Sequence, residues 1–131
     1  MKDSSKYIDD ETIAPTCDLL RRIHPLWIVE DKNSGGTRIS SMGFKDPTMS
    51  IHIGDDLAAA GHPVEAVLEK YPEWDLAAIK ASTARDMEQV VCRDHDPYEL
   101  CHGIVAGKKR KNMARAFASE ATANWIVRRP R

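Results

Sequence analysis

The sequence lacks several features that would assign a protein to a class at once. No run of apolar residues approaches the roughly 20 that a membrane-spanning helix needs. The segment from Met1 to Glu11 contains no apolar core of the kind found in secretory signals, so we expect a cytoplasmic protein that does not enter a membrane. There are no internal repeats and no low-complexity tracts. At 131 residues, the chain fits one domain that is long enough to bury a core.

Cysteine is scarce, and its three residues form no disulfide framework because their number is odd. Cys92, His95, Cys101 and His102 lie within eleven residues, and zinc accepts all of these ligand types. Their spacing is not that of a usual zinc finger, and adjacent residues of a strand point to opposite faces. We therefore predict neither a metal nor another cofactor. Cys92, His95 and Cys101 are the residues to inspect for a metal site.

Apolar patterning predicts one α+β domain over residues 13–127, with a small, mainly antiparallel sheet, several short helices and a C-terminal amphipathic helix. The expected strands cover 26–29, 37–44, 49–53, 76–81, 89–92 and 101–106. The expected helices cover 13–23, 55–60, 64–71, 83–88 and 109–124. In the last of these, Met113, Phe117 and Ala121 recur at a spacing of four and mark the buried face. We expect residues 1–12 to be flexible and residues 128–131 to form a loose basic tail.

The formal net charge of −1 hides a strong asymmetry along the chain. Residues 106–131 contain eight Lys or Arg and one acid, a net charge of +7, which leaves about −8 on the preceding residues. Such a separation suits the binding of a polyanion by one end of the molecule. It is equally compatible with pairing inside the fold or with head-to-tail association, so the oligomeric state stays open.

The cations begin where an expected strand ends at Gly107. Helix N-termini favour negative charge because of the backbone dipole, so a run of four cations there suggests a compensating anionic partner. The predicted anion-binding residues are Gly107, Lys108, Lys109, Arg110, Lys111 and Arg115. The junction is not a Walker A loop, which needs an earlier glycine and a Ser or Thr after the lysine. The alternative interpretation is a solvated basic helix face.

His102 and His52 are the candidate catalytic residues. His102 lies in the strand that leads to Gly107, whereas His52 alternates with two isoleucines and is expected on the solvent side of its strand. Either Cys92 or Cys101 beside a histidine would make a nucleophilic pair, but no local pattern marks an activated thiol. The serines at positions 40, 41 and 50 lack the glycine frame of a nucleophile elbow.

Two resemblances bear on function. Arg38, Ser40 and Ser41, taken with His24 and Glu88, resemble the scattered Arg/Ser/Glu sets of ADP-ribosyl-transferring folds by analogy alone. The segments 38–44, 49–51, 96–97 and 102–105, with the basic alanine-rich helix that ends at 125, cover about two thirds of the chain. Their layout is similar to that of a group of short bacterial accessory proteins from mobile-element or defence neighbourhoods. The resemblance implies a small bacterial partner protein and carries no activity over.

Together, these patterns favour a binding module over an enzyme. We expect the basic C-terminal helix to contact nucleic acid or the acidic surface of a partner protein. The alternative is a small enzyme that acts on a phosphate-containing substrate, such as a nucleotide or an RNA end. In that case the Gly107 amide and Lys108 would hold the phosphate, and His102 or His52 would act as acid or base.

Overall fold

The computed structural model describes residues 6–131, which form eight strands, three α-helices and three short 3₁₀ helices. The strands are β1 (Asp18–Ile23), β2 (Ile28–Glu30), β3 (Thr37–Ile39), β4 (Thr48–Ile53), β5 (Asp75–Lys80), β6 (Val90–Arg93), β7 (His102–Ala106) and β8 (Trp125–Val127). The helices are α1 (Gly54–Ala59), α2 (Ala81–Asp86), α3 (Lys111–Ala123), η2 (Pro25–Trp27), η3 (Ser41–Phe44) and η4 (Val64–Leu68). The predicted α+β class is confirmed.

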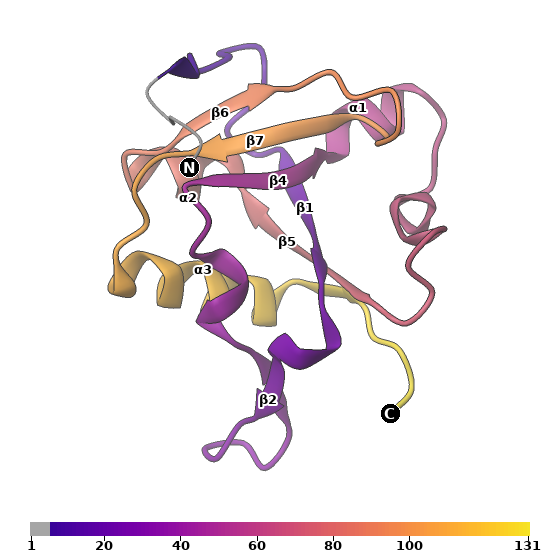
Figure 1. Ribbon diagram of the computed structural model, residues 1–131, viewed down its shortest axis with the longest axis vertical. Helices are drawn as coiled ribbons and strands as arrows, with labels where there is room; N and C mark the ends of the chain where they lie inside the picture. The colour runs from indigo at the N-terminus through magenta and orange to yellow at the C-terminus, as the bar shows by residue number, and fades with distance from the viewer. Residues whose placement is uncertain (1–5) are drawn as a thin grey trace.

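Six of the strands form one antiparallel sheet in the order β6-β7-β4-β1-β5-β8, and β2 pairs with β3 in a separate hairpin (Figure 1). Helix α3 covers one face of the sheet, where Phe117 and Ala121 pack among sheet residues such as Leu19 and Ile51. The expected apolar face of this helix is thereby confirmed. Burying a side chain as large as Phe117 contributes about 2–3 kcal/mol.

The first predicted helix, over residues 13–23, is wrong. From Asp18 onward this segment is β1, which pairs with β4 on one side and with β5 on the other. Leu19 and Leu20 are both buried because each packs on a different face of the sheet, Leu19 toward α3 and Leu20 toward α1 and η4. A central strand with a core on both faces reads as a continuous apolar run, which is easily taken for part of a helix.

The expected strand over residues 37–44 is shorter than predicted. It ends at Ile39 because the hydroxyl of Ser40 accepts a hydrogen bond from the Met42 amide, at 3.2 Å, and caps η3. The 3₁₀ helix that follows brings Phe44 against Phe117, with ring centroids 6.3 Å apart. The turn therefore places the end of the hairpin beside α3, which creates the groove described below.

Strands β1 and β4 are hydrogen-bonded only near Leu19 and Leu20 and then diverge (Figure 1). The side chain of Arg21 fills the wedge between them. Its Nη1 donates to the Ser50 carbonyl at 2.8 Å, and its Nε and Nη2 donate to the Gly43 carbonyl. Burial lowers the pKa of Arg21 to about 10. The guanidinium therefore holds the backbone of β4 in place at Ser50.

The two ends of the described chain are attached to the domain. Near the N-terminal end, the Asp10 amide donates to the Val91 carbonyl at 2.8 Å; the rest of the predicted flexible segment, residues 1–5, lies outside the described residues. At the C-terminal end, Arg131 Nη2 lies 2.8 Å from the buried carboxylate of Asp75. The basic tail is therefore held against β5 rather than loose. Within residues 6–131, no helix is long and apolar enough to cross a membrane.

Candidate functional site

The protein's own groups occupy much of the Gly107 junction. The Gly107 amide donates to the Pro47 carbonyl at 2.9 Å and is not available to a ligand. Lys109 Nζ donates to the carbonyls of Val105 at 2.8 Å and Gly107 at 3.2 Å, and burial lowers the pKa of Lys109 to about 8. Lys108, in contrast, is exposed. Of the predicted anion-binding residues at the junction, Gly107 and Lys109 thus have structural roles.

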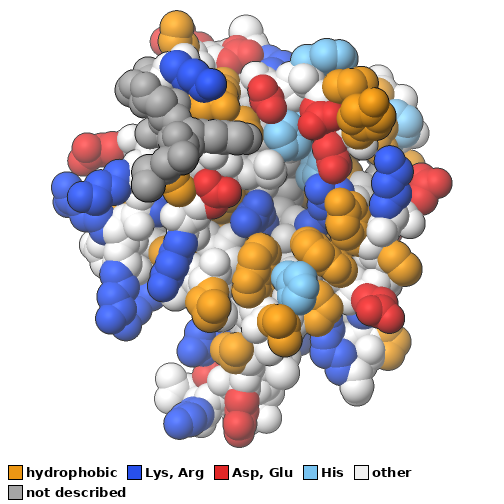
Figure 2. Space-filling model, in the orientation of Figure 1, with side chains coloured by type: hydrophobic (Ala, Val, Ile, Leu, Met, Phe, Trp, Pro, Cys, Tyr) orange, Lys and Arg blue, Asp and Glu red, His pale blue; other side chains and the backbone are white. Residues whose placement is uncertain are grey.

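The remaining predicted cations form an exposed basic surface. Lys108 and Arg110 lie just before α3, and Lys111 and Arg115 lie on it. Lys and Arg side chains gather over the start of this helix in Figure 2. Residues four apart in a helix lie on the same face, so Lys111 and Arg115 point the same way.

Arg115 also lines a groove of about 700 Å³ between α3 and the β2–β3 hairpin, including the turn that follows the hairpin. The polar side chains that line it include Asp31, Arg38, Ser40, Ser41, Arg115 and Ser119. Three of these, Arg38, Ser40 and Ser41, were singled out from the sequence for a different reason. The groove brings them to Arg115, which is more than 70 residues away in the chain.

The groove carries a net positive charge, from two arginines and one carboxylate. Arg38 and Arg115 are both exposed, and neither lies within salt-bridge distance of a carboxylate in the described part of the chain. Asp31 is the one acid in its lining. Hydrogen bonds from the Ser34 hydroxyl and the Asn33 amide hold the pKa of Asp31 below its usual range, so its carboxylate stays ionised.

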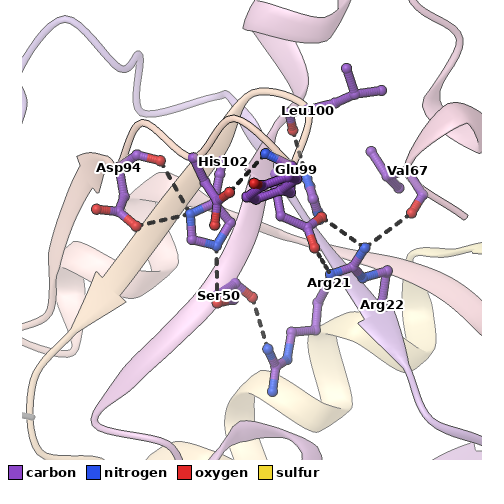
Figure 3. A network of polar contacts seen from close by, with 11 residues as sticks. Arg21, Arg22, Ser50, Val67, Asp94, Glu99, Leu100 and His102 are labelled. Carbon is purple, nitrogen blue, oxygen red and sulfur yellow. Dashed lines mark hydrogen bonds and ion pairs between the residues drawn. The ribbon is translucent and has the colours of Figure 1, made fainter. Parts of the chain in front are cut away.

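A second polar cluster lies on the sheet face opposite α3 (Figure 3). Ser50 and His52 are two residues apart in β4 and therefore share a face, and His52 is the direct cross-strand partner of His102 in β7. The two imidazole rings lie 6.0 Å apart. His102 Nε2 lies 3.0 Å from Ser50 Oγ, and its Nδ1 lies 3.1 Å from Asp94 Oδ2. Both predicted catalytic histidines are thus in one cluster.

His52 is not on the solvent side of its strand, as the sequence suggested. It is 2% exposed because the segment from Asp94 to Cys101 folds over this face. Its Nδ1 lies 2.7 Å from the Leu100 carbonyl, an acceptor, so Nδ1 carries the proton. Burial lowers the pKa of His52, which keeps the ring neutral near pH 7.

An ion pair closes the cluster on the side of β1. Arg22 donates to both carboxylate oxygens of Glu99, at 2.9 and 3.1 Å, and also to the Val67 carbonyl at 3.3 Å. Its guanidinium lies 4.2 Å from the centre of the Tyr71 ring. Figure 2 shows this face of the molecule hollowed near its middle, with histidine and basic side chains around the hollow.

The histidines and the Gly107 junction are separate places. Within the β4–β7 pairing, His102 lies opposite His52 at one end and Ala106 lies opposite Thr48 at the other. Gly107 is five positions beyond His102, and at about 3.3 Å per residue of extended chain the two lie roughly 16 Å apart. The predicted enzyme arrangement, with phosphate held at Gly107 and Lys108 beside a catalytic histidine, therefore does not form.

The metal candidates do not converge. Cys92 packs with Ile104 and Ala106, whereas Cys101 packs against the core under α1 and η4, and His95 is exposed. Burial raises the pKa of both thiols, which disfavours the thiolate that a metal or an electrophile needs. Among residues 6–131, no group of three or more His, Cys, Asp or Glu side chains is placed to hold a metal ion.

Sequence reasoning missed Ser50 and Asp94 as partners of His102. The alternation of a strand places Ser50 on the same face as His52, but its contact with His102 depends on the register between β4 and β7. Asp94 carried no such signal, since its position depends on the antiparallel turn back from β6 to β7. No protein-family model, curated protein or solved structure matches this chain. The proposals below therefore rest on the groove beside α3 and on the polar cluster around His102.

Proposed function

We propose that the protein binds the phosphate backbone of a nucleic acid through the groove between α3 and the β2–β3 hairpin. The observation that carries the proposal is that Arg38 and Arg115, two exposed arginines outside salt-bridge distance of any carboxylate among the described residues, both line a groove that also carries serine hydroxyls. Arginine, serine and backbone amides are the donors that proteins commonly direct at phosphate oxygens. The guanidinium fork also matches phosphate geometry in two parallel hydrogen bonds.

The basic surface continues beyond the groove, and this favours a polymer over a small anion. Lys111, Arg115 and Ser119 succeed one another at a spacing of four along α3. At 1.5 Å per residue they span about 12 Å of one helix face. Lys108 and Arg110 extend this line of donors at its start. A strand with a charge on every nucleotide would meet several of these side chains at once.

Contact with the backbone, rather than with the bases, is expected. The groove is lined by Ile39 and small or polar side chains, and no aromatic side chain of the described residues contributes to it. Bases that stack in a protein groove usually do so on aromatic rings. The proposal is therefore sequence-independent binding, dominated by charge and sensitive to salt. An accessory role in a mobile-element or defence neighbourhood of a bacterium remains a further proposal that rests on the resemblance alone.

An NMR titration tests where and what the protein binds. Single-stranded RNA, duplex DNA and polyglutamate would each be added to isotope-labelled protein at low salt. We expect the nucleic acid to shift amide signals of residues 38–41 and 115–122, and polyglutamate to cause much smaller shifts. Equal responses to polyglutamate would assign the groove to an acidic protein partner instead. Shifts confined to other residues would contradict the groove as the site.

A further inference from the structure

Ser50, His102 and Asp94 form a hydrogen-bonded series that the anion-binding groove does not use. Ser50 Oγ lies 3.0 Å from His102 Nε2, and Asp94 Oδ2 lies 3.1 Å from His102 Nδ1. In Figure 3 the His102 ring stands between the other two side chains. A serine is activated when it lies within hydrogen-bond reach of a base, and the base lies within reach of a group that orients it.

The protonation state of His102 follows from its acceptors. Its Nδ1 faces both the carboxylate of Asp94 and the Asp94 backbone carbonyl, at 3.1 and 3.2 Å. A carbonyl oxygen only accepts hydrogen bonds, so Nδ1 carries a proton in the neutral ring. Nε2 then has a free lone pair, which accepts the hydrogen bond from the Ser50 hydroxyl. This is the tautomer that a general base needs toward serine.

Burial and hydrogen bonds position two members of the series. The His102 side chain is 7% exposed, and the Arg21 guanidinium fixes the Ser50 carbonyl at 2.8 Å. Ser50 itself is only partly buried. Glu99 and Leu100, which approach His52, also line a cavity of about 240 Å³, to which Ser50, His102 and Asp94 do not contribute.

We propose that Ser50 is the nucleophile of an acyl-transfer site for carboxylic esters, with His102 as its general base and Asp94 as a positioning residue. Ser50 Oγ forms a bond to the carbonyl carbon of the ester while its proton passes to His102 Nε2. The carbon–oxygen bond to the alcohol then breaks, and the alcohol leaves with that proton. Water, activated by the same nitrogen, releases the carboxylic acid and restores Ser50. This activity is independent of the proposed nucleic-acid binding.

A fluorophosphonate probe tests the proposal on the wild-type protein, because it phosphonylates activated serines and loses fluoride. We expect one probe per chain, mapped by mass spectrometry to the peptide that contains Ser50. p-Nitrophenyl acetate should be hydrolysed. A wild-type protein that takes up no probe, or takes it up at another serine, would overturn the proposal without any variant being made.

Variants then separate the three roles. Ser50→Ala should abolish labelling and ester hydrolysis, and His102→Gln should slow labelling at least about 100-fold, as expected when a general base is lost. Asp94→Asn should slow it roughly tenfold, since a backbone carbonyl also holds Nδ1, and Asp94→Glu should recover part of the rate. Ser82→Ala, which removes a serine in α2, is the matched control. Unchanged labelling in a folded His102→Gln protein would contradict the assignment.

Discussion

Arg22 and Glu99, 77 residues apart in the chain, are joined by two hydrogen bonds of 2.9 and 3.1 Å. The pair fastens the segment before β7 to β1 and so covers His52. The two side chains are 16% and 23% exposed, so the pair is largely screened from water. We expect Glu99→Gln to lower the free energy of unfolding by about 2 kcal/mol, because a charged hydrogen-bonded partner is lost. Urea unfolding measures this, with the exposed Glu69→Gln as a control that should differ from wild type by less than about 0.5 kcal/mol.

The buried side chain of His52 should make the free energy of unfolding depend on pH. Burial holds its pKa in the folded protein below the ordinary value of 6.5, so the unfolded chain takes up a proton first as the pH falls. The free energy of unfolding should therefore decrease as the pH drops below 6.5, by up to about 1.4 kcal/mol per pH unit, until the folded state also binds the proton. The His52 ring is also faced by Glu99, Arg22 and His102. These three residues are unchanged in the variant with which the wild type is compared below.

The comparison protein for that experiment is His52→Gln, whose amide can still donate to the Leu100 carbonyl. Denaturant unfolding of both proteins between pH 7.5 and 5.5 gives the difference in stability at each pH. The wild type should lose its advantage in free energy of unfolding over His52→Gln as the pH falls, because only the wild type has a histidine to protonate at this position. A constant difference across this range would show that His52 does not titrate differently on unfolding.

A substitution at Gly103 tests how tightly the sheet is packed around β7. A Cβ atom at this position would lie 2.8 Å from both the Cys92 carbonyl and Ile51 Cδ1. Gly103→Ala should therefore lower stability by about 1–3 kcal/mol, as overpacking of a core commonly does. Gly36→Ala is the control, because its nearest neighbour, the Ser34 hydroxyl, would be 3.6 Å away. Equal unfolding midpoints for the two variants would contradict the described packing around β7.

Asp31 provides a gain-of-binding test of the groove. Its ionised carboxylate repels phosphate, and Arg38 is close enough to stabilise that ionised form. Asp31→Asn should therefore tighten nucleic-acid binding several-fold at low salt, and the gain should shrink as salt screens the charge. Fluorescence anisotropy with a labelled oligonucleotide measures the effect. Glu69→Asn removes an acid outside the groove and should leave the affinity nearly unchanged, so an equal gain there would point to net charge alone.

Regular patterns in the sequence predicted the elements whose apolar residues recur with a fixed period. The four-residue spacing of Met113, Phe117 and Ala121 predicted α3, and the alternation around Ile51 predicted β4, because each pattern repeats with the period of its element. The same reasoning failed for β1. Its residues Leu19 and Leu20 are buried on opposite faces, so the segment has no alternation to detect.

The candidate site was only partly predictable for a related reason. His102 and His52 were named from the sequence, and Arg115 from the charge run, because residue type alone marks them. Their partners come from distant segments. The groove needs the turn at Ser40 to bring Arg38 to α3, and the cation at Lys109 folds inward onto backbone carbonyls. Neither event leaves a local periodic signal.

The salt dependence of nucleic-acid binding tests the central claim most directly. The slope of log affinity against log salt would be measured for wild type, for Arg38→Gln/Arg115→Gln, and for Lys70→Gln, an exposed lysine outside the groove. The account predicts that the double variant binds more weakly on all sequences and that its slope is smaller by about 2, one for each lost phosphate contact. The slope of Lys70→Gln should match that of wild type. The account would be contradicted if the wild-type protein bound no nucleic acid. It would also be contradicted if the double variant had the same salt slope as the wild type.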